Sequence, residues 1–120
     1  MKPYSRSDRV AGLIHQVVAE LLRTQIKDPR LSGTTITGVK VTRDLRHARI
    51  YYTTAGDEHS RQSALRGFEQ AHGFVKRELA ERVELRYMPE LAFFYDESID
   101  TGARIEKLLK SVRRKDEPHS

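Results

Sequence analysis

The sequence predicts an α+β fold in which helices cover one face of a three-stranded sheet. Apolar residues recur at the helical period from Val10 to Ile26 and again from Ala64 to Val83. Three other segments, rich in β-branched and aromatic residues, alternate as half-buried strands do. A small sheet of three strands cannot bury both of its faces. We therefore expect two layers, one of helices and one of strands, with the other face of the sheet more open to solvent.

The first helix has the clearest pattern in the chain. Its apolar side chains are Val10, Leu13, Ile14, Val17, Val18, Leu21, Leu22 and Ile26. We expect Ser7 to be the N-cap, with Asp8 in the first turn. Since Pro29 disfavours a helical Asp28, the helix is predicted to stop near Lys27.

Residues 36–42 and 47–54 are predicted to form a hairpin of two strands. On the first strand, one face carries Thr37, Val39 and Val41. On the second strand, one face carries Ala48, Ile50 and Tyr52, and the other carries Arg49, Tyr51 and Thr53. Residues 43–46 would form the turn between them.

The second helical stretch follows helix-capping residues at positions 56–60 and contains a glycine. Its apolar side chains are Ala64, Leu65, Phe68, Ala71, Val75, Leu79 and Val83. Gly73 lies in the middle, where glycine costs about 1 kcal/mol relative to alanine. Phe74 also belongs to a slightly different face. We therefore predict a kink that divides this stretch into two helices.

A third strand and a last helix complete the predicted fold. Residues 91–95 follow Pro89 and place Leu91, Phe93 and Tyr95 on one face. Asp96 and Glu97 are expected to cap a short helix with the apolar side chains Ile105, Leu108, Leu109 and Val112. We predict one domain at 1–112 and a polar, disordered C-terminal tail at 113–120.

The composition favours a polyanionic partner. Among 120 residues, 22 are lysine or arginine and 17 are acidic, giving a net charge of +5. Nucleic acid is the commonest partner of such a chain. The absence of cysteine excludes disulfides and thiolate metal sites and fits a reducing compartment. No apolar run approaches a membrane span, and no signal peptide is evident, so a cytoplasmic protein without a membrane partner is expected.

Signs of catalysis are weak, and we expect no enzymatic activity, metal or cofactor. The histidines, at His15, His47, His59, His72 and His119, lack the spacing of metal ligands. Phosphate-binding and nucleophile motifs are also missing. Asp96 and Glu97 keep a metal-dependent ribonuclease open as an alternative, although adjacent strand residues point to opposite sides. A protein-interaction module that uses the C-terminal helix is another alternative.

Four phrases of the sequence, in this order, closely resemble the ribosome-binding factor A family, bacterial assembly factors of the small ribosomal subunit. They are residues 26–31, residues 42–45 with 48–51, residues 71–76, and residues 89–98. The predicted element order is also that of the bacterial type of KH domain, in which a loop between two short helices clamps a nucleic-acid backbone. The resemblance covers the chain from about Arg6 to Val112.

The resemblance implies a KH-like RNA-binding domain in which an Ala-x-Gly kink, here Ala71, His72 and Gly73, replaces the Gly-x-x-G loop. It also implies a monomeric, non-catalytic factor that binds the immature 30S subunit and its 16S rRNA during late assembly and rRNA processing. Assembly GTPases that act on the same subunit are implied as further partners. A general KH-like RNA-binding module is the alternative. Without the two-glycine loop, we expect recognition of shape and phosphates.

Candidate RNA contacts fall into groups of basic and small residues. The group around the kink is Arg66, Ala71, His72, Gly73, Lys76 and Arg77. A second group combines Lys2, Arg6 and Arg9 with Arg43 and Arg46, and a third is Lys110, Arg113, Arg114 and Lys115. Ordinary solvated charge explains the second and third groups equally well. Arg30 is a separate candidate.

Aspartates and aromatic residues have simpler explanations. Asp28 and Asp44 are expected to stabilise their own turns rather than contact RNA. The aromatic residues in phase with the apolar strand faces are Tyr52, Phe93 and Tyr95, and these are assigned to the core. Tyr51 and Phe94 are therefore the only two candidates for stacking on a base.

Overall fold

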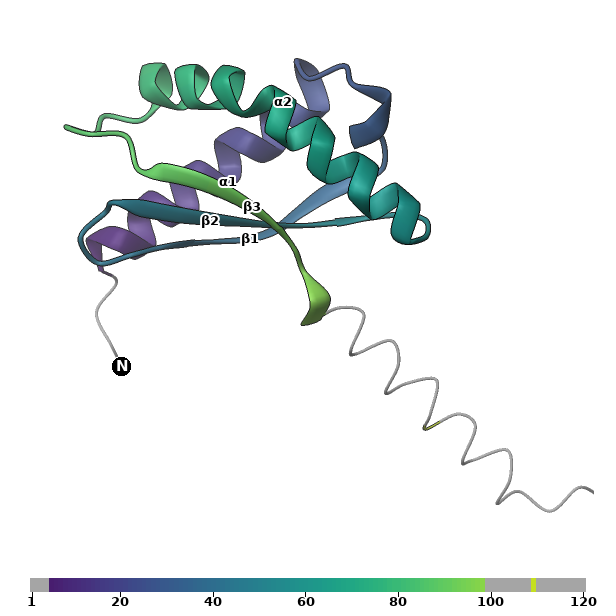
Figure 1. Ribbon diagram of the computed structural model, residues 1–120. Coiled ribbons are helices and arrows are strands. Elements are labelled where there is room, and N and C mark those ends of the chain that lie inside the picture. Colours follow the sequence, from purple (N-terminus) through teal and green to yellow (C-terminus); the bar gives the residue numbers. More distant parts are fainter. Residues whose placement is uncertain (1–4, 99–108, 110–120) are drawn as a thin grey trace, which may run out of the picture.

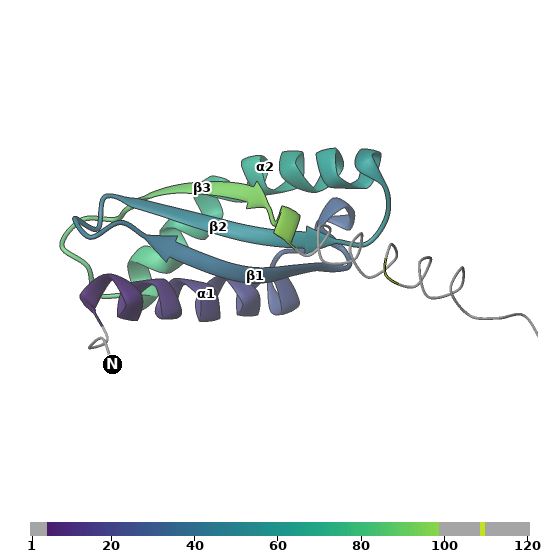
Figure 2. The same ribbon diagram turned by 90° about the horizontal axis from the view of Figure 1, so that it is seen from below.

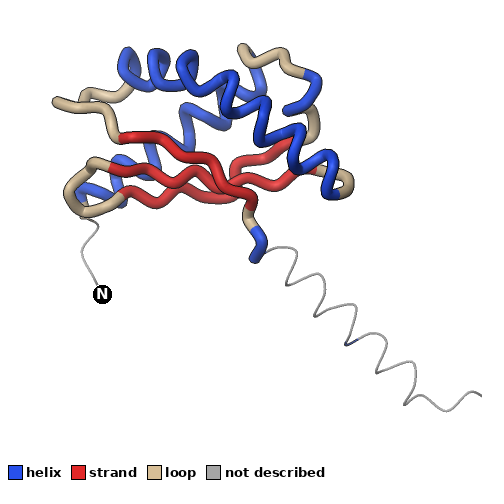
Figure 3. Tube along the Cα trace, viewed as in Figure 1, coloured by secondary structure: helices blue, strands red, loops and turns tan. Residues whose placement is uncertain are grey.

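The computed structural model describes residues 5–98 and residue 109. It contains two long helices, one short 3-10 helix and a three-stranded sheet. The sheet forms one layer and both long helices pack on the same side of it (Figure 1; Figure 3), which confirms the predicted α+β architecture. Glu97, Ser98 and Leu109 are helical, and the rest of the predicted last helix lies outside the described residues, as does the tail.

Helix α1 spans Arg6–Thr24 and begins two residues before the start predicted from the sequence. Ser5, not Ser7, is the N-cap: its hydroxyl accepts from the Asp8 N–H at 3.1 Å, and the Asp8 carboxylate accepts from the Ser5 N–H at 3.3 Å. Ser7 is buried instead. The helix also ends before Lys27, because the N–H groups of Gln25 and Ile26 both donate to the Leu21 carbonyl.

The sheet has the strand order β1-β2-β3, with β1 (Thr34–Val41) antiparallel to β2 (His47–Thr54) and β3 (Glu90–Tyr95) parallel to β2. The predicted faces of β2 and β3 are confirmed, since their inward residues are buried or pack on the core. The predicted face of β1 is wrong at one position. A bulge between Ile36 and Gly38 turns Ile36 inward, whereas the Thr37 hydroxyl donates to Asp96.

Helix α2 spans Glu58–Arg82 without interruption, so the predicted division into two helices is wrong. Its axis bends part-way along, as two views show (Figure 1; Figure 2). One glycine in a helix lowers the stability of the fold by about 1 kcal/mol relative to alanine. Burial of a single large apolar side chain stabilises the fold by more than this. The buried residues of α2, which include Phe68, Val75 and Leu79, therefore hold the helix together across Gly73.

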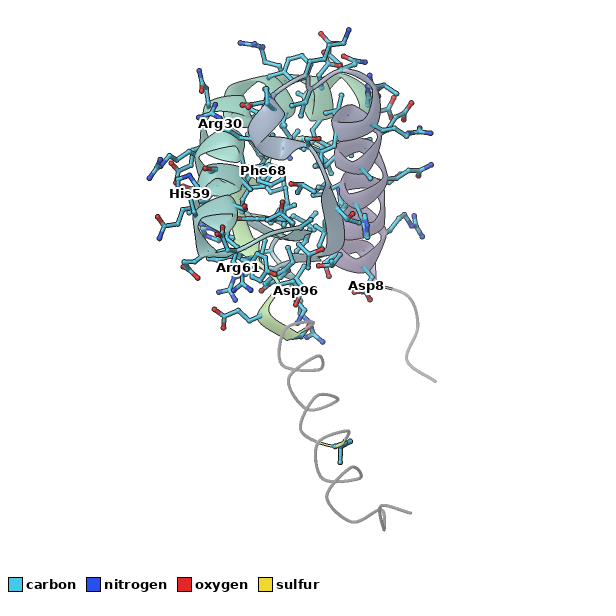
Figure 4. All side chains as sticks on the ribbon, turned by 90° about the vertical axis from the view of Figure 1, so that its right-hand side faces the viewer. Asp8, Arg30, His59, Arg61, Phe68 and Asp96 are labelled. Atoms are coloured by element: carbon cyan, nitrogen blue, oxygen red, sulfur yellow. The ribbon has the colours of Figure 1, made fainter. Side chains whose placement is uncertain are left out.

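Aromatic side chains fix α2 above the sheet. The Phe68 ring stacks on Phe93, with centroids 4.6 Å apart, and its centroid lies 4.7 Å from that of Tyr52. Figure 4 shows Phe68 pointing from α2 into the interior. At the other end of α2, Arg82 lies 3.7 Å from the carboxylate of Glu20 on α1. Among the described residues, no helix is both long and apolar enough to cross a membrane.

Candidate nucleic-acid interface

Four segments meet at one end of the molecule and enclose a groove of about 780 Å³. They are the first turn of α1, the β1–β2 turn, the middle of α2 and the loop between α2 and β3 (Figure 1). The charged residues that line this basic groove are Arg6, Arg46, Lys76, Arg86, Asp44 and Glu90. Cations thus outnumber carboxylates by four to two, as a site for a phosphate backbone requires.

Hydrogen bonds hold the β1–β2 turn where Arg46 lines the groove. The Asp44 carboxylate accepts from the Thr42 hydroxyl at 2.6 Å and from the Arg46 N–H at 3.1 Å. These two bonds lower the pKa of Asp44, so it stays ionised and engaged within the turn. The Arg46 carbonyl accepts from the Glu90 N–H at 2.8 Å, which ties the turn to β3. The predicted local role of Asp44 is confirmed.

Helix α2 contributes a structural residue and an exposed cation to the groove. His72 is half-buried, and its Nε2–H donates to the Leu91 carbonyl at 3.1 Å, which fastens α2 to the outer edge of β3. Lys76, one turn later on the same side of the helix, is exposed. Within the described part of the chain, neither Arg46 nor Lys76 forms an ion pair. Both charges are therefore available to a ligand.

The other members of the kink group lie away from the groove. Arg66, Gly73 and Arg77 are spaced by seven and four residues on α2, so they share its outward face, and all three are exposed. Ala71 is half-buried and packs against the core. The sequence therefore grouped residues that the fold divides between the groove wall and the outer surface of α2.

The second basic group lies close to the groove but does not enter it completely. Arg6 and Arg46 line it, as described above. Arg9 lines a smaller hollow beside it, together with Arg6, Val83 and Leu85. Arg43 is exposed in the β1–β2 turn. Lys2 and the third predicted group, residues 110–115, lie outside the described residues.

Arg30 is engaged within the protein. Its guanidinium lies 2.7 Å from the Asp28 carboxylate and donates to the Gln70 side chain of α2 at 2.5 Å. Figure 4 shows Arg30 beside α2. Asp28 also accepts from the Arg30 N–H at 2.9 Å and so caps the 3-10 helix Pro29–Leu31. The local role predicted for Asp28 is confirmed, and Arg30 links this turn to α2.

Asp28 is expected to make the stability of the fold depend on acidity. Hydrogen bonds from the Arg30 side chain, then from its N–H, lower the folded-state pKa of Asp28. A lowered carboxyl pKa stabilises the fold above the unfolded value, about 3.9, and this stabilisation is lost as pH falls through the folded value. Asp28→Asn, which keeps the capping oxygen, should be less stable than the unaltered chain at neutral pH, and the difference should shrink in acid. Urea unfolding at several pH values measures it, and a difference that is independent of pH would contradict the prediction.

Two groove residues were not predicted from the sequence. Arg86 and Tyr87 lie in the loop between α2 and β3, and the Tyr87 side chain is 77% exposed. The Arg86 guanidinium lies 5.7 Å from the centre of the Tyr87 ring. The sequence does contain a sign of these two residues, which is an arginine next to an aromatic residue in a short loop. Loops on rigid scaffolds commonly carry binding residues.

A family model described as ribosome-binding factor A matches residues 6–109, which include every element around the groove. The chain belongs to the ribosome-binding factor A family. Ribosome-binding factor A of Desulfatibacillum aliphaticivorans is 52% identical over 118 residues, covering 98% of this chain and 96% of that protein. The Geobacter metallireducens protein is 50% identical over 109 residues, covering 91% and 92%. The predicted resemblance is confirmed.

Solved structures of ribosome-binding factor A have the same fold. The crystal structure of the Thermus thermophilus protein has a TM-score of 0.67 at 26% identity, covering 74% of this chain and 93% of that one. A homology model of the Thermus thermophilus protein, fitted into a cryo-EM map of its complex with the 30S subunit, has a TM-score of 0.61 at 26% identity, covering 72% of this chain and 91% of that one. These similarities agree with the KH-like fold.

Proposed function

We propose that this chain binds the immature 30S ribosomal subunit through 16S rRNA and assists its late assembly and rRNA processing. The basic groove is the observation that carries the proposal, because it brings cations from four separate segments to one surface. The family member fitted into a 30S complex supports the choice of partner. The chain would act by binding, as a monomer in the cytoplasm, alongside assembly GTPases on the same subunit.

The groove favours recognition of the RNA backbone over reading of its sequence. Helix α2 is continuous, so it lacks the loop between two helices with which KH domains wrap single-stranded nucleotides. Lysine and arginine side chains instead meet phosphates, which fix the position of a protein on RNA without specifying bases. Tyr87, exposed beside Arg86, adds one ring on which an unpaired base would stack.

Sedimentation with ribosomal particles tests the proposal directly. The purified chain is mixed with immature small subunits, mature small subunits or large subunits and centrifuged through a sucrose gradient. We expect it to travel with the immature small subunits in preference to the other particles. Equal recovery with all three would reduce the proposal to general RNA binding, and no recovery would refute it.

Binding to the subunit is expected to weaken steeply with salt. Each phosphate contact contributes about 0.7 to 0.9 to the slope of log affinity against log salt concentration. The four groove cations should therefore give a slope of about −3. The same centrifugation assay, repeated at several salt concentrations, measures this slope. A slope near zero would mean that the groove cations do not meet phosphates.

A further inference from the structure

The face of the sheet opposite the helices carries two aromatic rings beside two cations. The strand register places Gly38, Tyr51 and Phe94 in one row across the three strands. The adjacent row holds Lys40, Arg49 and Ala92. Because strand residues alternate between faces, both rows point away from the buried side chains of the core. We call Lys40, Arg49, Tyr51 and Phe94 the aromatic face.

The two rings form a continuous, accessible surface. The centroids of Tyr51 and Phe94 lie 5.9 Å apart, and their planes are tilted by 34°. Phe94 is 44% exposed. Beside Tyr51, a Cβ on Gly38 would meet no atom within 4 Å, so packing does not require a glycine there and the flank of the ring is open. Ala92, two residues before Phe94 on the same face of β3, has a small side chain.

The charges in the row next to the rings, on Lys40 and Arg49, are positive. The Lys40 ammonium lies 5.9 Å from the centre of the Tyr51 ring, and Arg49 is opposite Lys40 in the register. Neither forms an ion pair among the described residues. Two carboxylates, those of Asp96 and Glu97, line the hollow beyond the rings, on the other side of the ring row from Lys40 and Arg49. The Asp96 carboxylate accepts from the Thr37 hydroxyl and from the N–H and hydroxyl of Ser98. These bonds hold the Asp96 carboxylate at the end of β3, so the row beside Tyr51 and Phe94 that offers charge to a phosphate is the cationic one.

We propose that the aromatic face binds an unpaired nucleotide of RNA. The base stacks on Phe94 and Tyr51, and the neighbouring phosphate meets Lys40 and Arg49, which lie one row away, about 6.6 Å along the strand. The inference rests on the proposed function for the choice of RNA as partner. It adds a second surface, because no residue of the aromatic face lines the basic groove.

Charge argues for RNA over the chain's own C-terminal segment as the occupant. Residues 99–120 follow Ser98, which lines the hollow beside Tyr51 and Phe94. That segment carries six basic residues, Arg104, Lys107, Lys110, Arg113, Arg114 and Lys115. Its four acidic residues are Asp100, Glu106, Asp116 and Glu117, so its net charge is +2 and repels the cations of the face.

Phe94→Leu in the full chain tests the inference, because leucine keeps an apolar side chain and removes the ring. Affinity is measured by fluorescence anisotropy with a short oligouridylate and with a blunt RNA duplex that has no unpaired base. We expect about tenfold weaker binding of the oligouridylate, the loss of one stacked base, and unchanged binding of the duplex. Phe94→Tyr should restore the affinity for oligouridylate. Leu65→Ala, which removes exposed apolar surface on α2, should bind both probes as the unaltered chain does.

The outcomes separate this inference from the proposed function. If Phe94→Leu binds oligouridylate normally, or weakens both probes equally, stacking on this face is refuted. The subunit sedimentation assay is then still decisive for the proposed function, since that assay depends on the basic groove. Leu108→Asp with Leu109→Asp tests the other occupant. A shift of the Phe94 ring signals in NMR spectra of this variant without RNA would show that residues 99–120 cover the face, and would overturn the inference.

Discussion

Replacement of Arg46 and Lys76 together by glutamate is expected to lower the affinity for immature small subunits about a hundredfold or more. Both side chains are exposed in the basic groove and form no ion pair among the described residues. A unit charge about 4 Å from a phosphate contributes about 1 kcal/mol even in bulk water. Reversal of two charges therefore costs about 4 kcal/mol before screening by salt, and each tenfold loss of affinity corresponds to about 1.4 kcal/mol.

A matched control separates the groove from the overall charge of the chain. Arg23→Glu with Lys27→Glu changes the net charge by the same amount, and both residues line a different hollow, between the end of α1 and β1. Long-range attraction is largely screened beyond about 10 Å at moderate salt, so this control should lose much less affinity. Both variants should keep the helical circular dichroism spectrum. Equal losses would mean that net charge, rather than the groove, determines binding.

The outward face of α2 provides a second comparison. The sequence placed Lys76 and Arg77 in one RNA-binding group, but the structure puts only Lys76 in the groove. The affinity of the Arg66→Glu with Arg77→Glu variant for subunits therefore measures the contribution of the outer surface of α2 alone. If this variant binds subunits as weakly as the groove variant does, the RNA interface extends around α2, as the sequence grouping implied.

Features that depend on local patterns were predicted correctly from the sequence. The helical period of α1 and the alternation of β2 and β3 follow from which side chains face the core, and each can be read from neighbouring residues. The bulge between Ile36 and Gly38 and the continuity of α2 across Gly73 could not be predicted from neighbouring residues. Both depend on packing between segments that are distant in sequence, which overrides local propensity.

The candidate site was predicted as separate pieces. Arg6, Arg46 and Lys76 were each identified from charge, but only the fold shows that they line one groove. The contact between Arg30 and α2 was missed for the same reason, since its partner there, Gln70, is 40 residues away in sequence. Arg86 was missed because the loop that carries it has no periodic pattern from which to argue.

Two glycines of α2 are expected to respond to alanine in opposite directions. At Gly67, which is buried, a Cβ would lie 2.9 Å from Cγ of Leu31 and 3.0 Å from its Cδ2. Leu31 is itself buried, so it has little room to move away. Overpacking of this kind typically costs about 1 to 3 kcal/mol. At Gly73, a Cβ would meet nothing within 4 Å, and the backbone φ is not left-handed, so Gly73→Ala should raise the free energy of unfolding by up to about 1 kcal/mol.

Chemical unfolding of the two variants, combined with the subunit-binding assay, assigns the role of each glycine. Both alanines gain the same helix propensity, so the difference between their unfolding free energies isolates the contact with Leu31. The sequence led us to expect that Gly73→Ala would destabilise or straighten the kink, and the open space around Gly73 reverses the expectation for stability. A more stable Gly73→Ala protein that binds subunits weakly would mean that RNA approaches the backbone at Gly73 closely. A more stable protein with unaltered binding would exclude that approach and leave the groove cations as the basis of binding.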